Sequence, residues 1–236
     1  MKNQSYFIAG TDTGVGKTLI TLSIMQSLQK TGLSVCGMKP VASGCDLVNG
    51  DLVSEDATLI KKHGSQDLPL KVINPLAYKN PCSPNIAAEI EGKMMDMGLV
   101  VQAYDEIQSL ADIVLVEGVG GWRSPCFSSL GMADIAKALK LPVILVVGIK
   151  LGCINHALLS VECILRDNVN LAGWVANMVA PDFKYTEETV NYIKGQIKAP
   201  LLGTVPYLAT LDYQQLHPYI SVQDLMADND DQKLMI

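Results

Sequence analysis

Six short apolar segments, separated by helical patterns and polar loops, are the feature of this sequence that most constrains its fold. Several are continuous apolar runs rather than alternating ones, which is typical of strands covered on both faces. Strand and helix alternate along the chain, and this alternation predicts an α/β fold: a mostly parallel β-sheet with right-handed crossovers and helices on both faces. The six segments are residues 6–10, 34–41, 112–118, 142–148, 171–179 and 200–206.

The length and the apolar content favour a single domain. The chain has 236 residues, which is ordinary for one large α/β domain. We expect this domain to span residues 1–224 and the acidic C-terminal tail, residues 225–236, to be poorly ordered. Hydrophobic residues make up 49% and charged residues 18% of the chain, so part of the apolar surplus is expected to be buried between subunits.

The charge pattern favours a small-molecule partner over nucleic acid or a membrane. The formal net charge is −6, and no run of Lys and Arg reaches three residues. The N-terminal apolar stretch is too short for a signal peptide, and no apolar run is long enough to span a bilayer. Six cysteines are scattered without a C-x-x-C spacing, which favours free thiols in a reducing compartment. We therefore expect a cytoplasmic protein.

The stretch GTDTGVGKT, residues 10–18, follows the first apolar segment and opens a helical pattern. It matches the phosphate-loop pattern G-x-x-x-x-G-K-[ST] except that its first glycine, Gly10, stands one residue early. A glycine-rich turn that merely caps a helix is the alternative. In a phosphate loop, Lys17 would reach the outer phosphates and Thr18 the magnesium ion. The amides expected to face the phosphates are those of Gly14, Val15, Gly16 and Lys17.

Ligands of a parallel sheet lie beyond the carboxyl ends of its strands, and acidic residues occur there. Glu117 ends the apolar run DIVLVE, where a magnesium-binding carboxylate is expected. Asp56, in SEDATLI, is a second candidate, although spacing does not decide between it, Asp51 and Glu55. Either acid could also be a surface carboxylate or a helix cap.

Lys39 closes the second apolar segment in the sequence KPVASG and is expected in the same cleft, with Ser43 four residues later. Alternatively, Lys39 is simply the first exposed residue after a strand. Two lysines, a hydroxyl and two acids around a nucleotide would suit phosphoryl transfer, which depends on positioning and charge neutralisation.

In combination, these segments resemble the dethiobiotin synthetase family. The resemblance rests on GTDTGVGKT, KPVASG, VEGVGGW, LPVILVVGIKLGCINHALL, LAGWVAN and PLLGTVPYLA, in this order over residues 5–210. The family has the longer phosphate loop, which accounts for the early Gly10. The resemblance implies a single-domain P-loop NTPase-like fold, so that residues 1–224 would form an ATP-dependent ligase domain.

The resemblance also implies a reaction. The substrates would be 7,8-diaminononanoate (7,8-diaminopelargonate), CO2 supplied as bicarbonate, and ATP, with Mg2+ as cofactor. One amine captures CO2 as a carbamate, the carbamate attacks the γ-phosphate to give a carbamic-phosphoric anhydride, and the second amine closes the cyclic urea. The products would be dethiobiotin, ADP and phosphate, formed in a homodimer with sites near the subunit interface.

Site residues are implied one by one. Lys17, Lys39 and Ser43 would be catalytic, the last two also holding the carbamate, and the glycines of GVGG, Gly120 among them, would let backbone amides approach the reacting groups. Substrate contacts across the dimer would come from Gly152, Cys153 and Asn155. The nucleotide would be held by Thr13, Gly14, Val15, Gly16, Lys17, Thr18, Glu117, Asn177, Pro206 and Tyr207, and Mg2+ by Thr18, Asp56 and Glu117.

Two positions qualify this assignment. Thr189 stands where the family often has a substrate-contacting tyrosine, so the carboxylate pocket differs in detail. Asn155 could also be a helix N-cap, a role compatible with binding a carboxylate.

Three other readings remain. A ParA/MinD-like ATPase switch would carry its signature lysine at position 12, where this sequence has Asp12. An amidoligase of cobalamin synthesis would need a glutaminase domain, for which 236 residues leave no room. A non-enzymatic nucleotide-binding module would bind ATP without substrate-dependent turnover.

Overall fold

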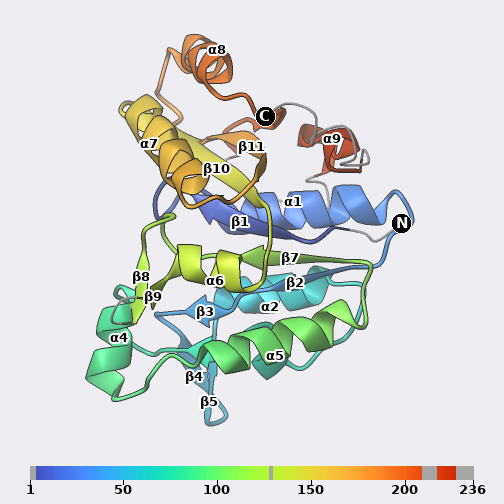
Figure 1. Ribbon diagram of the computed structural model, residues 1–236, viewed down its shortest axis with the longest axis vertical. Helices are drawn as coiled ribbons and strands as arrows, with labels where there is room; N and C mark the ends of the chain where they lie inside the picture. Colours follow the sequence, from blue (N-terminus) through green and yellow to red (C-terminus); the bar gives the residue numbers. More distant parts are fainter. Residues whose placement is uncertain (1–3, 128–129, 209–216, 227–236) are drawn as a thin grey trace.

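The computed structural model describes residues 4–127, 130–208 and 217–226. Its centre is a six-stranded sheet in the order β12-β11-β10-β1-β7-β2, and every neighbouring pair is parallel (Figure 1). Each strand falls within or overlaps one of the six apolar segments, so the predicted α/β fold is confirmed. The strands are β1 (Tyr6–Gly10), β2 (Val35–Met38), β7 (Ile113–Glu117), β10 (Val143–Ile149), β11 (Leu171–Met178) and β12 (Leu201–Val205).

Helices cover both faces of this sheet. In Figure 1, α5, α6 and α7 lie in front of the sheet, whereas α1 and α2 pack together behind it. The helical pattern predicted directly after the phosphate loop is α1. The longer helices are α1 (Lys17–Gln29), α2 (Glu55–His63), α4 (Pro84–Glu91), α5 (Met97–Gln108), α6 (Met132–Ala138), α7 (Cys153–Arg166) and α8 (Thr186–Gln196); the short ones are α3 (Leu70–Ile73), α9 (Gln223–Met226) and the 3-10 turn His217–Tyr219.

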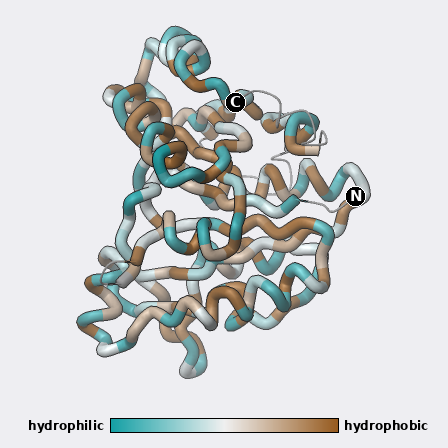
Figure 2. Tube along the Cα trace, in the orientation of Figure 1, coloured by the Kyte–Doolittle hydropathy of each residue, from teal (hydrophilic) through white to brown (hydrophobic). Residues whose placement is uncertain are grey.

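The core lies along the central strands. Every residue of β1, β7 and β10 is buried, and the hydropathy trace is brown along the middle of the sheet (Figure 2). Glu117, the last residue of β7, is the one ionisable side chain in these three strands apart from Tyr6. The order of the strands therefore decides which polar residues meet at the carboxyl end of the sheet.

Three small two-stranded sheets were not predicted. The hairpin of β4 (Asp46–Val48) and β5 (Asp51–Val53) turns at Asn49 and Gly50, whose φ angles of 52° and 93° are left-handed. Asn-Gly between apolar runs is a strong hairpin signal, so the sequence does contain this element. The other two sheets join β3 (Val41–Ala42) to β6 (Leu76–Ala77) and β8 (Pro125–Phe127) to β9 (Leu130–Gly131).

The expected boundary between domain and tail falls inside a helix. Leu225 belongs to α9 and is buried, and its carbonyl accepts a 2.7 Å hydrogen bond from the Tyr6 hydroxyl. Residues 227–236 lie outside the described residues, so the expectation of a poorly ordered tail stays a prediction. Among the described residues, no helix has both the length and the apolar content to cross a membrane. None of the six cysteines forms a disulfide.

Candidate active site

Glycines shape the loop between β1 and α1. Gly14 and Gly16 have φ angles of 73° and 84°, a left-handed conformation that favours glycine. A Cβ on Gly16 would lie 2.2 Å from Nδ2 of Asn177, and a Cβ on Gly10 would lie 2.9 Å from Nζ of Lys17. The early glycine of the motif is thus required by the close approach of Lys17.

The N-terminus of α1 is built to receive an anion. Gly16 occupies the N-cap position without a side-chain hydrogen bond, and the first turn has no acidic residue. Unsatisfied amides and the helix dipole at such an end favour a phosphate group. The alternative of a turn that only caps a helix is therefore less favourable, because no side chain satisfies these amides.

Lys17 is held inside the cleft by backbone oxygens. Its side chain is 8% exposed, and its ammonium donates to the carbonyls of Asp12 at 3.0 Å and Gly120 at 2.8 Å. Burial, together with the nearby charge of Lys39, lowers the pKa of Lys17 to about 8. An anionic phosphate next to this ammonium would stabilise its charged form.

Lys39 lies between the two predicted acids. It is 3% exposed, and its ammonium lies 2.8 Å from Oδ2 of Asp56 and 2.6 Å from Oε1 of Glu117. Burial lowers the pKa of Lys39, but the two carboxylates outweigh it, so that the pKa is raised overall. Burial likewise raises the pKa of Asp56, and Lys39 outweighs it, so that the pKa is lowered. The alternative that Lys39 is an exposed residue after a strand is wrong.

Thr18 completes this cluster. Its hydroxyl oxygen lies 2.8 Å from Oδ1 of Asp56 and 2.9 Å from Oε1 of Glu117, although one hydroxyl proton serves only one acceptor at a time. Glu117 is fully buried, and its Oε2 has no hydrogen-bond partner among the described residues. The oxygens of Thr18, Asp56 and Glu117 thus converge, and one of them lacks a partner among the described residues. This arrangement fits Mg2+, which prefers hard oxygen ligands. Asp51 and Glu55 are exposed and take no part in this cluster, so the choice that spacing left open falls on Asp56.

The Asn177 side chain is hydrogen-bonded to the backbone of the phosphate loop. It lies near the end of β11, is 4% exposed, and donates from Nδ2 to the carbonyl of Val15 at 2.8 Å. Pro206 and Tyr207 follow β12, and the Tyr207 side chain is 49% exposed. Asn177 near the carboxyl end of β11 and Pro206 and Tyr207 just beyond that of the neighbouring β12 thus lie on the same side of the sheet, as the assignment to the adenine requires. Contact with adenine stays a prediction.

The loop after β7 differs from our expectation. The amides of Gly118, Val119 and Gly121 already donate to the Ile8 carbonyl, the Met132 sulfur and the Ser124 hydroxyl, respectively. The loop instead offers the Gly120 carbonyl to Lys17, because Gly120 has a left-handed φ of 63°. Gly120 is thus the glycine of this loop that positions Lys17, and the amides of Gly118 and Gly121 are already engaged within the protein.

The other residues singled out in the sequence differ in their exposure. Ser43 is half-buried directly after β3. Cys153 is 1% exposed, and Asn155 is exposed in the first turn of α7, whose N-cap is Gly152; the N-cap reading of Asn155 is therefore wrong. Thr189 is buried within α8, and Thr13 is exposed in the phosphate loop.

Two residues near Lys17 were not predicted as site residues. Asp12 carries the only carboxylate of the phosphate loop, and Lys150 directly follows β10. They meet at 3.4 Å between Oδ2 and Nζ, because β1 and β10 are neighbouring parallel strands. The order of the strands, which the sequence does not state, was the missing signal.

The structure has a parallel sheet and a glycine-rich loop that leads into α1, and a lysine, a hydroxyl and two carboxylates lie beside this loop. This fold and this site define a P-loop nucleoside triphosphatase. A family model described as an AAA domain matches residues 4–215. ATP-dependent dethiobiotin synthetase BioD of Aromatoleum aromaticum is 42% identical over 90% of this chain and 95% of its own length. The corresponding BioD proteins of Pseudomonas paraeruginosa (43% identical, 87% and 90% covered) and Vibrio cholerae (39% identical, 96% and 97% covered) are similar to it too. The chain belongs to the dethiobiotin synthetase family.

Solved structures share the fold at low sequence identity. The MinC:MinD cell division protein complex of Aquifex aeolicus aligns with a TM-score of 0.57 at 17% identity, covering 91% of this chain and 85% of the other. MinD of Pyrococcus horikoshii, complexed with Mg-ADP, aligns with a TM-score of 0.50 at 13% identity, covering 97% and 92%. These similarities show the fold alone.

The two left-handed glycines of the loop provide a matched test of its packing. Alanine at either position adopts an unfavourable backbone conformation, at a cost of about 1–2 kcal/mol. Gly16→Ala also collides with Asn177, whereas a Cβ on Gly14 meets nothing within 4 Å. We expect urea unfolding to show a further loss of about 1–3 kcal/mol for Gly16→Ala. Equal unfolding free energies for the two variants would contradict this packing.

Proposed function

We propose that this chain is a dethiobiotin synthetase, which uses ATP and Mg2+ to close the cyclic urea of dethiobiotin from 7,8-diaminononanoate and CO2. Family membership provides the reaction. The observation in this structure that carries the proposal is the buried Lys39 ammonium, which lies beside the phosphate loop and between Asp56 and Glu117. A second lysine at this place suits a substrate that becomes an anionic carbamate.

The residues would divide the work as follows. The α1 amides and Lys17 bind the phosphates and neutralise the charge that develops on the transferred phosphoryl group. Thr18, Asp56 and Glu117 would hold Mg2+, which would supply positive charge beside the phosphates. Lys39 and Ser43 hold the carbamate so that its oxygen faces the γ-phosphate. Asn177, Pro206 and Tyr207 would bind the adenine.

We also propose a homodimer. Exposed apolar side chains on α7 and in the segment before it support this: Leu151 is 89%, Leu159 52% and Leu165 56% exposed. Apolar groups gathered on one surface are typical of an interface. The partner's α7 would then present Gly152, Cys153 and Asn155 to the distal carboxylate. The unpaired thiols favour the cytoplasm, which remains a proposal.

The requirement for each substrate tests the function. We expect ADP release to need both 7,8-diaminononanoate and bicarbonate, with dethiobiotin formed in equal amount. Lys17→Ala should lower turnover by orders of magnitude, because the phosphoryl group loses its main side-chain partner. An ATP turnover rate that does not depend on the diamine would instead favour a MinD-like switch. ATP binding without turnover would favour a nucleotide-binding module.

Mixing two inactive variants tests the dimer. Lys17→Ala and Asn155→Ala damage different parts of one site, which the two chains of a mixed dimer supply separately. Random re-association makes about half the dimers mixed, each with one intact site, so roughly a quarter of the parental activity should return. If Asn155 serves its own chain, every site keeps a defect and the mixture stays inactive.

A further inference from the structure

Asp12 is a carboxylate that the assigned chemistry does not use. Its Oδ1 accepts a 2.7 Å hydrogen bond from the Thr13 amide, and its Oδ2 lies 3.4 Å from Nζ of Lys150. The side chains of Asp12 and Lys150 are 47% and 39% exposed, so both are accessible from solvent. The backbone carbonyl of the same residue binds Lys17, which ties Asp12 to the site of phosphoryl transfer.

The cleft is rich in positive charge. Lys17, Lys39 and Lys150 converge on it, and Asp56 and Glu117 are already engaged by Lys39 and Thr18. An alkyl diamine is cationic at neutral pH, since its amines resemble that of lysine. Such a substrate would be repelled unless a carboxylate met it. Asp12 is available for this, because an ion pair as long and exposed as Asp12–Lys150 contributes little.

We propose that Asp12 binds the second amine of the diamine substrate and orients it for ring closure, and that Lys150 is the resting counter-ion that this amine replaces. This inference rests on the proposed function. In the final step the bound ammonium first gives one proton to solvent, and its nitrogen, now neutral, attacks the carbonyl carbon of the anhydride. A C–N bond forms and the C–O bond to phosphate breaks; phosphate leaves with the electron pair and takes up the second proton that the nitrogen loses.

Two simpler roles compete with this one. Asp12 could merely cap the Thr13 amide, and Lys150 could bind phosphate. Asp12→Asn distinguishes amine binding from the first role, because an asparagine oxygen still accepts a hydrogen bond from the Thr13 amide but carries no charge. Lys150→Met separates the second, because methionine keeps the length of the stem and removes the cation.

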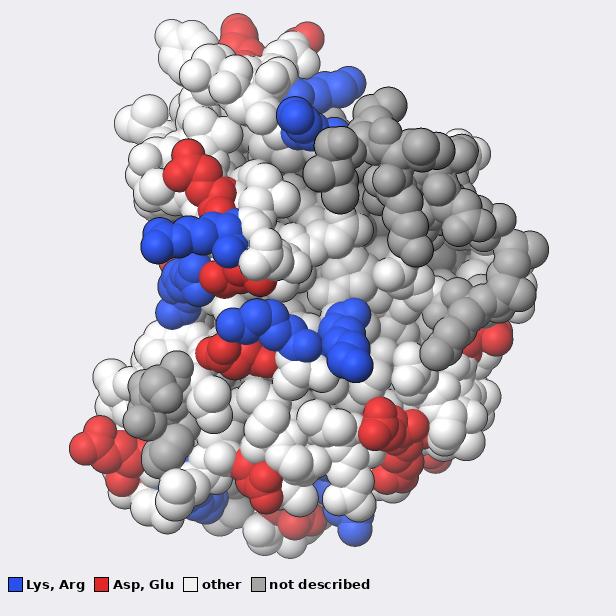
Figure 3. Space-filling model, viewed as in Figure 1, with Lys and Arg blue, Asp and Glu red and all other residues white. Residues whose placement is uncertain are grey.

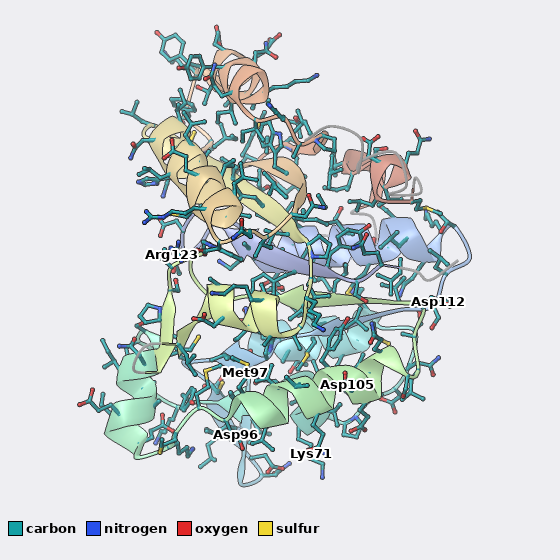
Figure 4. The ribbon with its side chains drawn as sticks, viewed as in Figure 1. Lys71, Asp96, Met97, Asp105, Asp112 and Arg123 are labelled. Carbon is teal, nitrogen blue, oxygen red and sulfur yellow. The ribbon has the colours of Figure 1, made fainter. Side chains whose placement is uncertain are left out.

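Binding is measured by calorimetry with the full-length protein, Mg2+ and a non-hydrolysable ATP analogue. The probes are 7,8-diaminononanoate and the two monoamines that each lack one of its amines. We expect the parent to prefer the diamine, and Asp12→Asn to bind it about tenfold or more weakly, with unchanged affinity for the ATP analogue. The preference over one of the monoamines should disappear. Asp105→Asn, on the exposed face of α5 (Figure 4), is the matched control for loss of a carboxylate.

Turnover gives a second readout. If the second amine is misplaced, water hydrolyses the anhydride before the ring closes. Asp12→Asn should therefore release ADP in excess of dethiobiotin, whereas the parent and Asp105→Asn should release ADP and dethiobiotin in equal amounts. Lys150→Met should bind the diamine at least as tightly as the parent, because a competing cation is gone. This variant keeps the inference testable if Asp12→Asn fails to fold.

Each contrary result has a distinct meaning. A parent that neither binds nor turns over the diamine contradicts the proposed function. A parent that turns it over, with Asp12→Asn unchanged in diamine affinity and in product ratio, overturns this inference alone. Weaker binding of the ATP analogue by Lys150→Met, with weaker binding of the diamine, would also overturn it and assign Lys150 to phosphate.

Discussion

The two ion pairs of the buried Lys39 hold the candidate active site together. Four elements supply the cluster: Lys39 follows β2, Glu117 ends β7, Asp56 lies in the first turn of α2 and Thr18 in that of α1. A charge taken out of water is costly unless it is paired, and removing one partner leaves the other uncompensated. The ends of these elements must therefore meet for any of the charges to be buried, and the phosphate loop lies directly against them.

The same contacts suggest how one lysine serves two purposes. In the described structure, Lys39 is the counter-ion of both carboxylates. On our account, Asp56 and Glu117 would hold Mg2+ in the nucleotide complex, and Lys39 would then be available to the carbamate. The unpartnered Oε2 of Glu117 is the oxygen that such an ion would satisfy. The visible face of the molecule carries charges of both signs, with blue and red groups side by side in the middle of Figure 3.

The fold could be predicted from the sequence because the six strands are continuous apolar runs, which only a sheet covered on both faces accommodates. The phosphate loop could also be predicted, because Gly10, Gly16 and Lys17 stand together in the short stretch GTDTGVGKT directly after the first strand. What could not be predicted was how residues from distant segments meet. Asp56 and Glu55 are adjacent in sequence, and only the phase of α2 turns one toward Lys39.

The same reason explains the errors elsewhere in the site. Asparagine often occupies the N-cap of a helix, but the N-cap of α7 is Gly152, with its left-handed φ of 91°. Asn155 therefore lies inside the helix, in its first turn. The GVGG loop was expected to present free amides, but contacts to Ile8, Met132 and Ser124 already occupy three of them. Asp12 and Lys150 are 138 residues apart and meet because β10 lies beside β1.

Metal binding by Asp56 tests the central claim most directly, because its neighbour Glu55 offers a matched control. Mn2+ in place of Mg2+ can be followed by electron paramagnetic resonance in the presence of ADP. We expect Asp56→Asn to weaken Mn2+ binding to the protein–ADP complex about tenfold or more, as loss of a charged ligand should, and Glu55→Gln to leave it unchanged. Equal Mn2+ affinity in the parent and Asp56→Asn, with both folded, would contradict the assignment of this cluster as the metal site.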